Sequence, residues 1–362
     1  MKVIISGGGT AGHINPALAI ADYLAKEKQA EILFIGTEKG LESRLVPQAG
    51  WDIRYIEVVG LIRKLTPKNL TVIKKLVTAV FRSKKIMKEF CPDLVIGTGG
   101  YVCAPVLFAA HSLGIPTVIH EQNVIPGVTV KMAAKTAERI CISFPETTRY
   151  LKPGYADKCV LTGNPIRSDM LQIDRIHARQ TLGLDSRPFI VAFGGSLGAA
   201  RLNDAVADFL NTQDTAGFQF LLGTGQRYFN EISQRITKKS TSIRIEPYID
   251  RMDLIMAAAD IVIGRAGALT VSELCALGKP SILIPSPNVA HDHQTYNAKS
   301  VEKAGGALVI LDAELTGERL TDAISQLLRQ PESLKHMAYN AKKIGITDGA
   351  KRICDTACSL LK

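Results

Sequence analysis

A glycine-rich turn with one histidine, Gly7-Gly8-Gly9-Thr10-Ala11-Gly12-His13, is the part of this sequence best suited to chemistry. It follows the apolar segment 3–5 and precedes a helix-like run at 17–21. A turn from a strand into a helix presents backbone N–H groups at the positive end of the helix, where oxyanions bind. An imidazole can gain or lose a proton near neutral pH. The turn therefore predicts an anion site with a proton-transfer group beside it.

An ordinary dinucleotide-binding domain with an incidental histidine is the alternative for this turn. The spacing of Gly7, Gly9 and Gly12 matches the dinucleotide fingerprint, which also needs an acidic residue at the end of the second strand. The second strand expected here, 31–36, is followed by Thr37 and has no acidic residue at its end. The turn alone leaves both interpretations open.

Alternating apolar and helical segments must position this turn. We expect strands near residues 2–6, 31–36, 52–58, 94–97, 116–120, 139–143 and 159–162, and then near 189–193, 218–222, 243–246, 260–264, 281–285 and 307–311. This alternation predicts an α/β protein with two parallel sheets. Turn residues at 163–167 indicate a linker. We expect domains at 1–163 and 164–340, followed by a C-terminal helix at 341–362.

Further glycine-rich turns occur in both halves. The first half contains Gly97–Tyr101, and the second contains Gly194–Ala199 and Gly264–Ala268. Ligands of open α/β sheets bind beyond the carboxyl ends of the strands. We therefore expect two domains that face each other across a central cleft, each holding one phosphate-bearing substrate.

Size and composition fit a globular protein. The chain has 362 residues, of which 46% are hydrophobic, enough for two domains with full cores. It has no apolar stretch long enough to span a membrane, and it begins with a strand where a secretory signal would stand. Seven scattered cysteines without a C-x-x-C pair fit a reducing compartment. Of these, Cys354 and Cys358 are expected on a buried helix face.

The net charge of +10 is concentrated at residues 63–88, which carry nine Lys and Arg and no acidic residue. Apolar residues recur there at helical spacing: Leu70, Ile73, Val77, Val80 and Phe81. One interpretation is an amphipathic helix that packs on the sheet with a solvated basic face. Another is a surface that also meets anionic lipid, with a membrane patch made of Ile73, Lys74, Lys75, Val77, Phe81, Lys84 and Lys85. Nucleic acid ranks third, because no recognition module accompanies the charge.

Seven motifs, taken in order, resemble one known family. They are Gly7–His13, Gly97–Tyr101, His120-Glu121-Gln122-Asn123, Gly163–Arg167, Gly194–Ala199, Arg265–Glu273 and Asp292–Thr295. The chain is similar over nearly its whole length to the MurG family, the N-acetylglucosaminyltransferases that convert lipid I to lipid II in peptidoglycan synthesis. The resemblance implies the GT-B fold, with two Rossmann-like parallel-sheet domains facing a central cleft and a last helix packed on the N-terminal domain.

The activity implied by this resemblance is transfer of GlcNAc from UDP-GlcNAc to the 4-hydroxyl of MurNAc in lipid I. The transfer would invert the anomeric carbon and would use no metal and no other cofactor. The expected location is the cytoplasmic face of the cell membrane, where the protein would be peripheral. The expected partners are UDP-GlcNAc, lipid I, the anionic membrane surface and a cell-wall synthesis complex, with no nucleic acid.

His13 is the expected catalytic base, and Glu121 is the runner-up. The resemblance implies a donor-binding set of Thr10, Gly12, Asn123, Arg167, Ser196, Ile249, Arg265, Ala268, Leu269, Glu273, His293 and Gln294. It implies acceptor and phosphate loops that contain Gly9, Gly99, Gly100, Tyr101 and Glu121. In the donor set, Glu273 would accept hydrogen bonds from the ribose, the backbone of Ile249 would read uracil, and Arg265 would neutralise the diphosphate.

Some positions depart from the family pattern. Ala266 stands where Ser is common, Leu222-Gly223 where His-Gln is frequent, and His293 where some members have Gln. The pair His291 and His293 flanks a carboxylate as a zinc site could, but further ligands are lacking at the usual spacing.

Two other functions remain as alternatives. One is another GT-B enzyme, either a UDP-sugar epimerase or a glycolipid glycosyltransferase. The basic apolar segment argues against an epimerase, which needs no lipid acceptor. The other is a non-catalytic nucleotide-sugar-binding protein, against which the presence of His13 argues.

Overall fold

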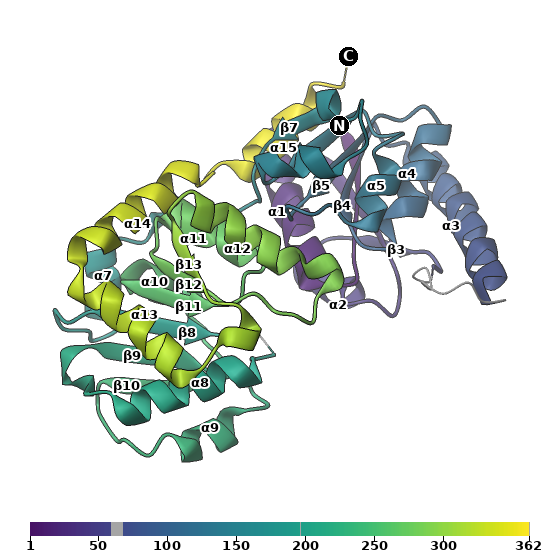
Figure 1. Ribbon diagram of the computed structural model, residues 1–362. Coiled ribbons are helices and arrows are strands. Elements are labelled where there is room, and N and C mark those ends of the chain that lie inside the picture. Colours follow the sequence, from purple (N-terminus) through teal and green to yellow (C-terminus); the bar gives the residue numbers. More distant parts are fainter. Residues whose placement is uncertain (59–67, 196, 362) are drawn as a thin grey trace. The chain divides into compact units, whose positions relative to one another are not determined.

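The chain folds into two compact units. The computed structural model describes residues 1–58, 68–195 and 197–361, and for residues 68–73 and 168 it describes the backbone alone (Figure 1). Residues 1–166 and 348–362 form the first unit, and residues 167–347 form the second. The sequence placed the second boundary at 340, inside helix α14 (Pro331–Ile344). That helix packs on α11 (Ala268–Leu277), so the whole of it belongs to the second unit.

The first unit is built on a parallel sheet of seven strands. They are β1 (Lys2–Gly7), β2 (Glu31–Gly36), β3 (Ile53–Tyr55), β4 (Leu94–Gly99), β5 (Thr117–Glu121), β6 (Arg139–Ile142) and β7 (Cys159–Leu161). Their order is β3-β2-β1-β4-β5-β6-β7, with a register shift between β1 and β4 at Ser6 and Gly7. The chain therefore reverses its direction of travel across the sheet between β1 and β4.

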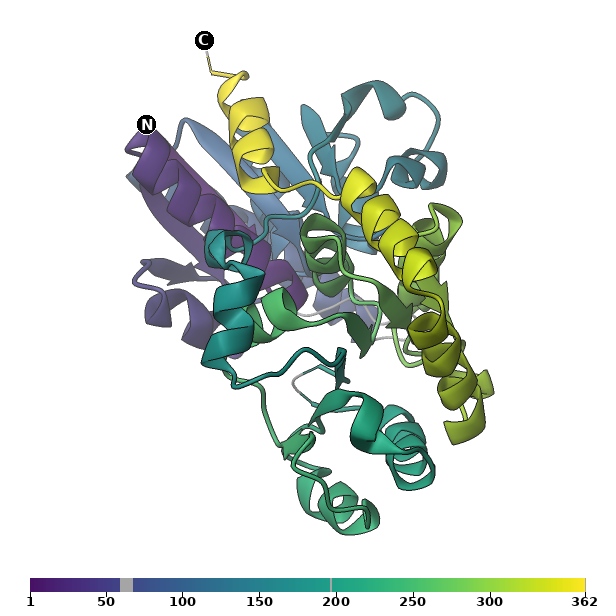
Figure 2. The ribbon, with the colours of Figure 1, turned by 90° about the vertical axis from the view of Figure 1, so that its left-hand side faces the viewer.

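Helices cover both faces of this sheet. They are α1 (Ala11–Lys28), α2 (Glu42–Gln48), α3 (Lys68–Phe90), α4 (Cys103–Ser112), α5 (Val128–Ala133) and α15 (Gly349–Cys358), with two short 3-10 turns at Pro145–Tyr150 and Ala156–Lys158. Alternate residues of a strand point to opposite faces. Ile4 accordingly packs with residues of α3, α4 and α5, whereas Val3 and Ile5 pack with α1 and α15. Figure 2 shows the yellow C-terminal helix near the purple helix α1, which it contacts.

The second unit repeats this plan with six strands. They are β8 (Phe189–Phe193), β9 (Gln219–Gly223), β10 (Ile243–Glu246), β11 (Ile261–Gly264), β12 (Ser281–Leu283) and β13 (Ala307–Val309), in the order β10-β9-β8-β11-β12-β13. The remaining helices are α6 (Ser168–Gln172), α7 (Arg175–Thr181), α8 (Ala200–Thr212), α9 (Phe229–Arg235), α10 (Met252–Ala258), α12 (His293–Lys303) and α13 (Gly317–Arg329), with 3-10 turns at Thr215–Gly217, Ala290–Asp292 and Asp312–Glu314.

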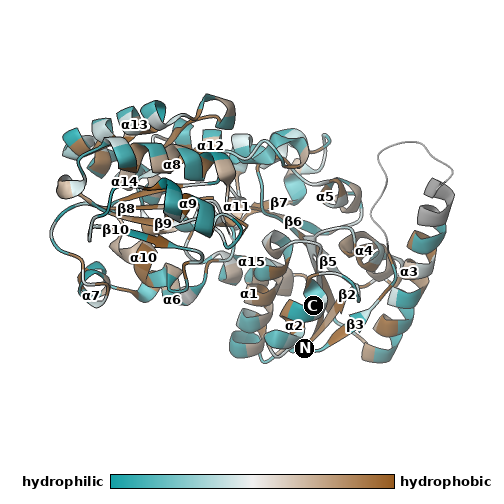
Figure 3. Cartoon of the chain, turned by 90° about the horizontal axis from the view of Figure 1, so that it is seen from below, coloured by the Kyte–Doolittle hydropathy of each residue, from teal (hydrophilic) through white to brown (hydrophobic). Residues whose placement is uncertain are grey.

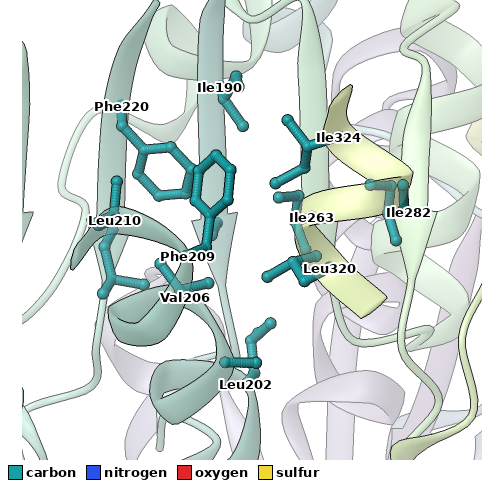
Figure 4. Packing of buried hydrophobic residues seen from close by; sticks show 14 of the residues in the cluster. Ile190, Leu202, Val206, Phe209, Leu210, Phe220, Ile263, Ile282, Leu320 and Ile324 are labelled. Atoms are coloured by element: carbon teal, nitrogen blue, oxygen red, sulfur yellow. The ribbon is translucent and has the colours of Figure 1, made fainter. Parts of the chain in front are cut away.

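One face of the second sheet forms a dense apolar core with α8 and α13. Phe220 and Ile263 extend from the sheet toward Phe209 of α8 and Leu320 of α13 (Figure 4). The rings of Phe209 and Phe220 lie 5.9 Å apart between centroids, a separation typical of favourable aromatic pairs. This packing fixes the start of α8 beside the turn that follows β8.

The predicted fold class is confirmed, because both sheets are parallel and each predicted strand forms. Each sheet has one pair of neighbouring strands from which the chain continues in opposite directions across the sheet. The pair is β1 and β4 in the first unit and β8 and β11 in the second. The four glycine-rich turns follow these four strands. A ligand site in an open α/β sheet lies at this point, beyond the carboxyl ends of the strands.

Helix α3 packs on the first unit with a different face from the one that the apolar spacing predicted. The face that packs on the unit consists of the smaller residues Ala79 and Ser83 together with Ile86 and Met87. Small side chains allow α3 to approach α4 closely. The larger Val77 and Phe81, predicted on the packed face, are 49% and 66% exposed. Figure 3 shows the resulting mixture of hydrophobic and hydrophilic segments along α3.

Two smaller expectations concern membranes and cysteines. No helix in the described part of the chain is both long and apolar enough to cross a bilayer. Cys354 is buried, and Cys358 is half-buried on the same face of α15 against the first sheet. The prediction that these two thiols mark a packed helix face is confirmed.

Candidate active site

The two glycine-rich turns of the first unit interlock. The N–H of Gly8 donates to the carbonyl oxygen of Gly99 at 3.2 Å. Gly100 has a φ of +84°, and a Cβ added there would lie 2.2 Å from the carbonyl oxygen of Gly8. Only glycine combines this backbone conformation with so close an approach. The turn after β4 therefore holds the turn after β1 in a fixed shape.

A buried carboxylate, Glu42 of α2, braces the same turn from the other side. Its oxygens accept hydrogen bonds from the N–H of Gly9 at 3.0 Å, from the N–H of Thr37 at 3.0 Å and from the Thr37 hydroxyl at 2.6 Å. The N–H of Gly9, a residue of the predicted acceptor and phosphate loops, is thus donated within the protein. The sequence analysis missed Glu42, and its only signal was a carboxylate shortly after the second strand.

His13 lies in the first turn of α1, and its neighbours fix both its backbone and its ring. Its carbonyl oxygen accepts a hydrogen bond from the Thr98 hydroxyl at 2.8 Å. Its Nδ1 lies 3.0 Å from Oε1 of Gln122. The ring packs against Gly99, where an added Cβ would lie 2.7 Å from Nδ1. An imidazole held in this way can act as a general base without first being ordered.

Gln122 and His120, which the sequence analysis quoted without giving them roles, are buried beside His13. The amide nitrogen of Gln122 lies 2.8 Å from the carbonyl oxygen of Thr98 and 3.1 Å from Nδ1 of His120. Burial lowers the pKa of His120 to about 4, so this imidazole is neutral near pH 7.

Glu121, the runner-up base, has hydrogen-bond donors on both of its carboxyl oxygens. Oε1 accepts from the Asn123 N–H at 2.8 Å and from its side-chain amide at 3.2 Å, and Oε2 accepts from the Gly127 N–H at 2.7 Å. Burial raises the pKa of this carboxyl. These contacts give Glu121 a structural part in shaping the loop at 121–127, and they hold Asn123 in place.

The remaining predicted residues of the first unit lie on the surface of these turns. Thr10 precedes α1 as its N-cap residue, and Thr10 and Gly12 are exposed. Tyr101 is 37% exposed, and its hydroxyl lies 3.5 Å from the Thr37 hydroxyl. The ring of Tyr101 lies against Gly9, since an added Cβ there would be 3.4 Å from it. Thr10 and Gly12 thus belong to the His13 turn, and Tyr101 packs against it.

A cavity of about 210 Å³ in the second unit suits a nucleoside. Its lining includes Gly223, Tyr248, Ile249 and Glu273. An added Cβ on Gly223 would lie 2.8 Å from the Ile249 side chain, so the departure to glycine at this position makes room for that residue. Burial raises the pKa of Glu273 to about 7, although nearby Arg167 opposes the shift. The predicted uracil and ribose contacts, Ile249 and Glu273, thus line one cavity.

A neighbouring cavity of about 530 Å³ has the chemistry of a diphosphate site. It is lined by the turn after β8, by the start of α8, by Arg265, Gly267 and Thr270 at the start of α11, and by Gln294. Helix α11 begins after Gly267 without a side-chain cap, and the positive end of a helix binds anions. The predicted residues Ala268 and Leu269 form the first turn of this helix.

Arg265 is held by a carboxylate that the sequence analysis missed. Its Nη1 donates to Asp312 at 2.5 Å and to the carbonyl oxygens of Ile284 and Pro285, both at 3.2 Å. Arg201, in the first turn of α8, also lines the cavity and donates to the carbonyl oxygen of Asp312 at 2.7 Å. Two cations therefore lie at the predicted diphosphate site, where one was expected.

Two predicted donor residues lie outside the linings of these cavities, and a third lies outside the described residues. Arg167 is exposed and pairs with Asp169, outside the lining of both cavities. His293 also lies outside both linings and donates from Nδ1 to the Ala290 carbonyl at 2.8 Å, whereas Gln294 next to it lines the larger cavity. Ser196 lies outside the described residues.

The described residues contain no metal-binding group. Within 1–58, 68–195 and 197–361, no three His, Cys, Asp or Glu side chains are grouped so that they could hold a metal ion. His291 has a φ of +55° and Asp292 a φ of +51°, so the backbone is strained there.

Comparisons with known proteins place the chain among glycosyltransferases. The glycosyltransferase family 28 N-terminal domain matches residues 3–142, and the C-terminal domain of the same family matches residues 189–353. A relative from Acetivibrio thermocellus is 50% identical over 100% of this chain and 99% of its own length. It is named UDP-N-acetylglucosamine–N-acetylmuramyl-(pentapeptide) pyrophosphoryl-undecaprenol N-acetylglucosamine transferase.

Solved structures agree with this placement. The crystal structure of Acinetobacter baumannii MurG matches with a TM-score of 0.82 and 29% identity over 99% of both chains. The UDP-GlcNAc 2-epimerase from Neisseria meningitidis, bound to UDP-GlcNAc, matches with a TM-score of 0.70 over 99% of this chain and 100% of its own. Its identity is only 15%, so it shares the fold alone.

Proposed function

This chain belongs to glycosyltransferase family 28, and from that premise we propose that it transfers GlcNAc from UDP-GlcNAc to the MurNAc of lipid I, forming lipid II. The observation that carries the proposal is the 50% identity, over the full chain, to a relative that is named for this transfer. The enzyme is an N-acetylglucosamine transferase of peptidoglycan synthesis. The epimerase alternative rests on likeness of fold and has no comparable identity to support it.

The second unit would hold the donor. Uracil would lie against Ile249, and the ribose hydroxyls would donate to the carboxylate of Glu273, in the smaller cavity. The diphosphate would lie in the larger cavity at the start of α11, near Arg265 and Arg201. Positive groups at this place stabilise the charge that develops on UDP as it leaves.

The first unit would supply the base. His13 would take the proton from the 4-hydroxyl of MurNAc while that oxygen attacks the anomeric carbon of GlcNAc. Attack from the face opposite the leaving UDP inverts that carbon and gives a β-linkage. The fixed ring of His13, between Gly99 and Gln122, supports this assignment. Because cations and a helix end lie at the diphosphate site, the chemistry would need no metal.

An assay with UDP-GlcNAc and a lipid I analogue tests these statements together. We expect UDP and a β-linked disaccharide, with turnover unchanged by a chelator. His13→Ala should abolish most of the turnover, whereas His111→Ala, a change at an exposed histidine of the same unit, should leave it intact. Epimerised donor, an α-linked product or loss of activity on chelation would contradict the corresponding part of the proposal.

Contact with the membrane would be made by the exposed side of α3. Val77 and Phe81 are exposed there, and Lys84 lies 5.9 Å from the Phe81 ring centroid. Lys74 and Lys85 are also exposed, whereas Lys75 donates to Glu57 at 2.6 Å. Ile73 lies outside the described side chains. An apolar centre with basic neighbours is the composition that binds anionic lipid surfaces.

Vesicle binding tests this surface. Phe81→Ser and Lys85→Gln should each weaken adsorption to anionic vesicles, the latter by about 1 kcal/mol at most. Lys343→Gln, an equal change of charge on helix α14 of the second unit, should have no such effect. Equal adsorption of all variants would remove α3 from the membrane contact. A peripheral place on the cytoplasmic face and a cell-wall synthesis complex as partner belong to the same proposal.

A further inference from the structure

A set of buried hydrogen bonds joins the ring of His13 to the protein interior through Gln122. The Gln122 side chain is 2% exposed. Its Nε2 lies 2.8 Å from the carbonyl oxygen of Thr98 and 3.1 Å from Nδ1 of His120. Its Oε1 lies 3.0 Å from Nδ1 of His13. Together these contacts determine where the protons lie.

The Thr98 carbonyl determines the orientation of the Gln122 amide. A carbonyl oxygen can only accept a hydrogen bond, so the NH₂ group of the amide must face it. The amide oxygen then faces His13. Because this oxygen also can only accept, Nδ1 of His13 must carry a proton. A neutral imidazole with its proton on Nδ1 has its lone pair on Nε2.

His120 supports the same orientation from the opposite side. Its Nδ1 accepts from the Gln122 amide, so its Nε2 carries the proton and lies 3.2 Å from the Gly163 carbonyl oxygen and 3.1 Å from the Ser143 hydroxyl oxygen. The Ser143 hydroxyl donates its own proton to a main-chain carbonyl at 2.9 Å. Every donor in the set therefore meets an acceptor. If the Gln122 amide were flipped, its oxygen would instead lie against the carbonyl oxygen of Thr98, and two acceptors would be in contact.

We infer that Gln122 is a positioning residue, which holds His13 with its proton on Nδ1 so that Nε2 receives the proton of the acceptor hydroxyl. This inference rests on the proposed function. In the step, the O–H bond of the acceptor breaks, its oxygen bonds to the anomeric carbon, and the bond from that carbon to the UDP oxygen breaks with the electron pair leaving on UDP. The proton ends on Nε2, and Nδ1–H then makes a charge-assisted hydrogen bond to Oε1.

Nitrogen NMR of the full chain tests the tautomer without any kinetic assumption. The chain has seven histidines, and the resonances of His13 are those missing from a His13→Gln sample. In ring-labelled protein at pH 8 we expect Nδ1 of His13 to carry the proton and Nε2 to carry none. A proton on Nε2, or an even mixture of the two forms, would overturn the inference.

Gln122→Met tests the consequence for catalysis, because Met has a similar size and its thioether sulfur is only a weak hydrogen-bond acceptor. We expect kcat to fall about 10–100-fold, as when other partners that orient a histidine are removed, with KM for UDP-GlcNAc unchanged. The acid limb of the kcat profile should move to lower pH, since the imidazolium loses an acceptor. Ser143→Ala is the matched control, because the Gly163 carbonyl remains for His120, and its kcat should stay close to that of the wild type.

The outcomes separate this inference from the proposed function. Suppose that Gln122→Met keeps the wild-type kcat and the wild-type acid limb while His13→Ala is inactive. That result would overturn the role of Gln122 and leave His13 as the base. Full activity of His13→Ala would instead remove the base itself. If Gln122→Met does not fold, the NMR measurement on the wild type still decides the tautomer.

Discussion

The two units share one strand order but use their glycine-rich turns differently. In the first unit the turns bond to each other and to the interior, with Gly8 donating to Gly99 and Gly9 to Glu42. In the second unit the corresponding turns line two cavities that contain Arg265 and Glu273. The shared fold thus determines where a ligand site lies, and the side chains determine its chemistry. In the first unit the turns fix the ring of His13, and we propose that the cavities of the second unit hold a charged nucleotide.

The largest effect is expected when both units are disabled together. His13→Ala should lower kcat by about 10²–10⁴-fold, the usual contribution of a general base. Glu273→Ala should weaken donor binding about 10–100-fold, as lost hydrogen bonds to a charged group do. In the double variant these free energies should add, so kcat/KM should fall about 10³–10⁶-fold. Steady-state kinetics of the four proteins measures this, and strong non-additivity would show that the two units do not divide the work.

The effect of Glu273→Ala alone tests the second unit by itself. The change should appear in KM for UDP-GlcNAc, while kcat at saturating donor stays near the wild-type value. Glu273→Gln keeps the size of the side chain, and its KM for UDP-GlcNAc should lie between those of the wild type and Glu273→Ala. A variant with wild-type KM would show that the ribose hydroxyls bind elsewhere.

A matched pair of glycine substitutions tests how differently the turns are packed. Gly100 and Gly195 have nearly equal φ values of +84° and +85°, so alanine should cost each roughly 1–2 kcal/mol for the backbone. At Gly195 no described atom lies within 4 Å of the added Cβ. At Gly100 that Cβ would lie 2.2 Å from the Gly8 carbonyl oxygen. This clash should lower the free energy of unfolding by about a further 1–3 kcal/mol. Thermal unfolding should therefore show a greater loss for Gly100→Ala, and equal losses would contradict the interlocked turns.

The smallest effect is expected from pH. The Glu273 pKa of about 7 means that its carboxylate, which accepts the ribose hydrogen bonds, is mostly protonated at pH 6 and mostly ionised at pH 8. UDP-GlcNAc should therefore bind up to about tenfold more weakly at pH 6 than at pH 8. The diphosphate is esterified on both sides and keeps its charge across this range. Titration calorimetry at both pH values measures the change, and Glu273→Gln should remove the dependence.

Much of the fold followed from local pattern. Each predicted strand formed, because buried parallel strands are short apolar runs bounded by turn residues. The direction in which α3 faces did not follow, since periodicity marks an apolar stripe without saying whether protein covers it. Phe81 lies on that stripe and is exposed, whereas Ser83 lies off it and is buried.

The candidate site could be predicted where one segment carries the proposed chemistry. His13 lies within the turn that identifies it, and Glu273 lies within the helix that follows the turn after β11. Glu42, Gln122 and Asp312 were missed as supporting residues, because the predicted site residues that they hold, Gly9, His13 and Arg265, are far from them in sequence. Gln122, for example, bonds to His13 across 109 positions. Such contacts depend on the order of strands in the sheet, which a single sequence does not display.

The division of work between the units can be tested most directly on one sample. The dissociation constant of UDP-GlcNAc is measured by calorimetry on His13→Ala protein that has lost its turnover. We predict a value within about twofold of the wild type, because the proposed donor cavities belong to the second unit and the imidazole to the first. Binding weakened tenfold or more would mean that His13 holds the donor, and its assignment as the base would be contradicted.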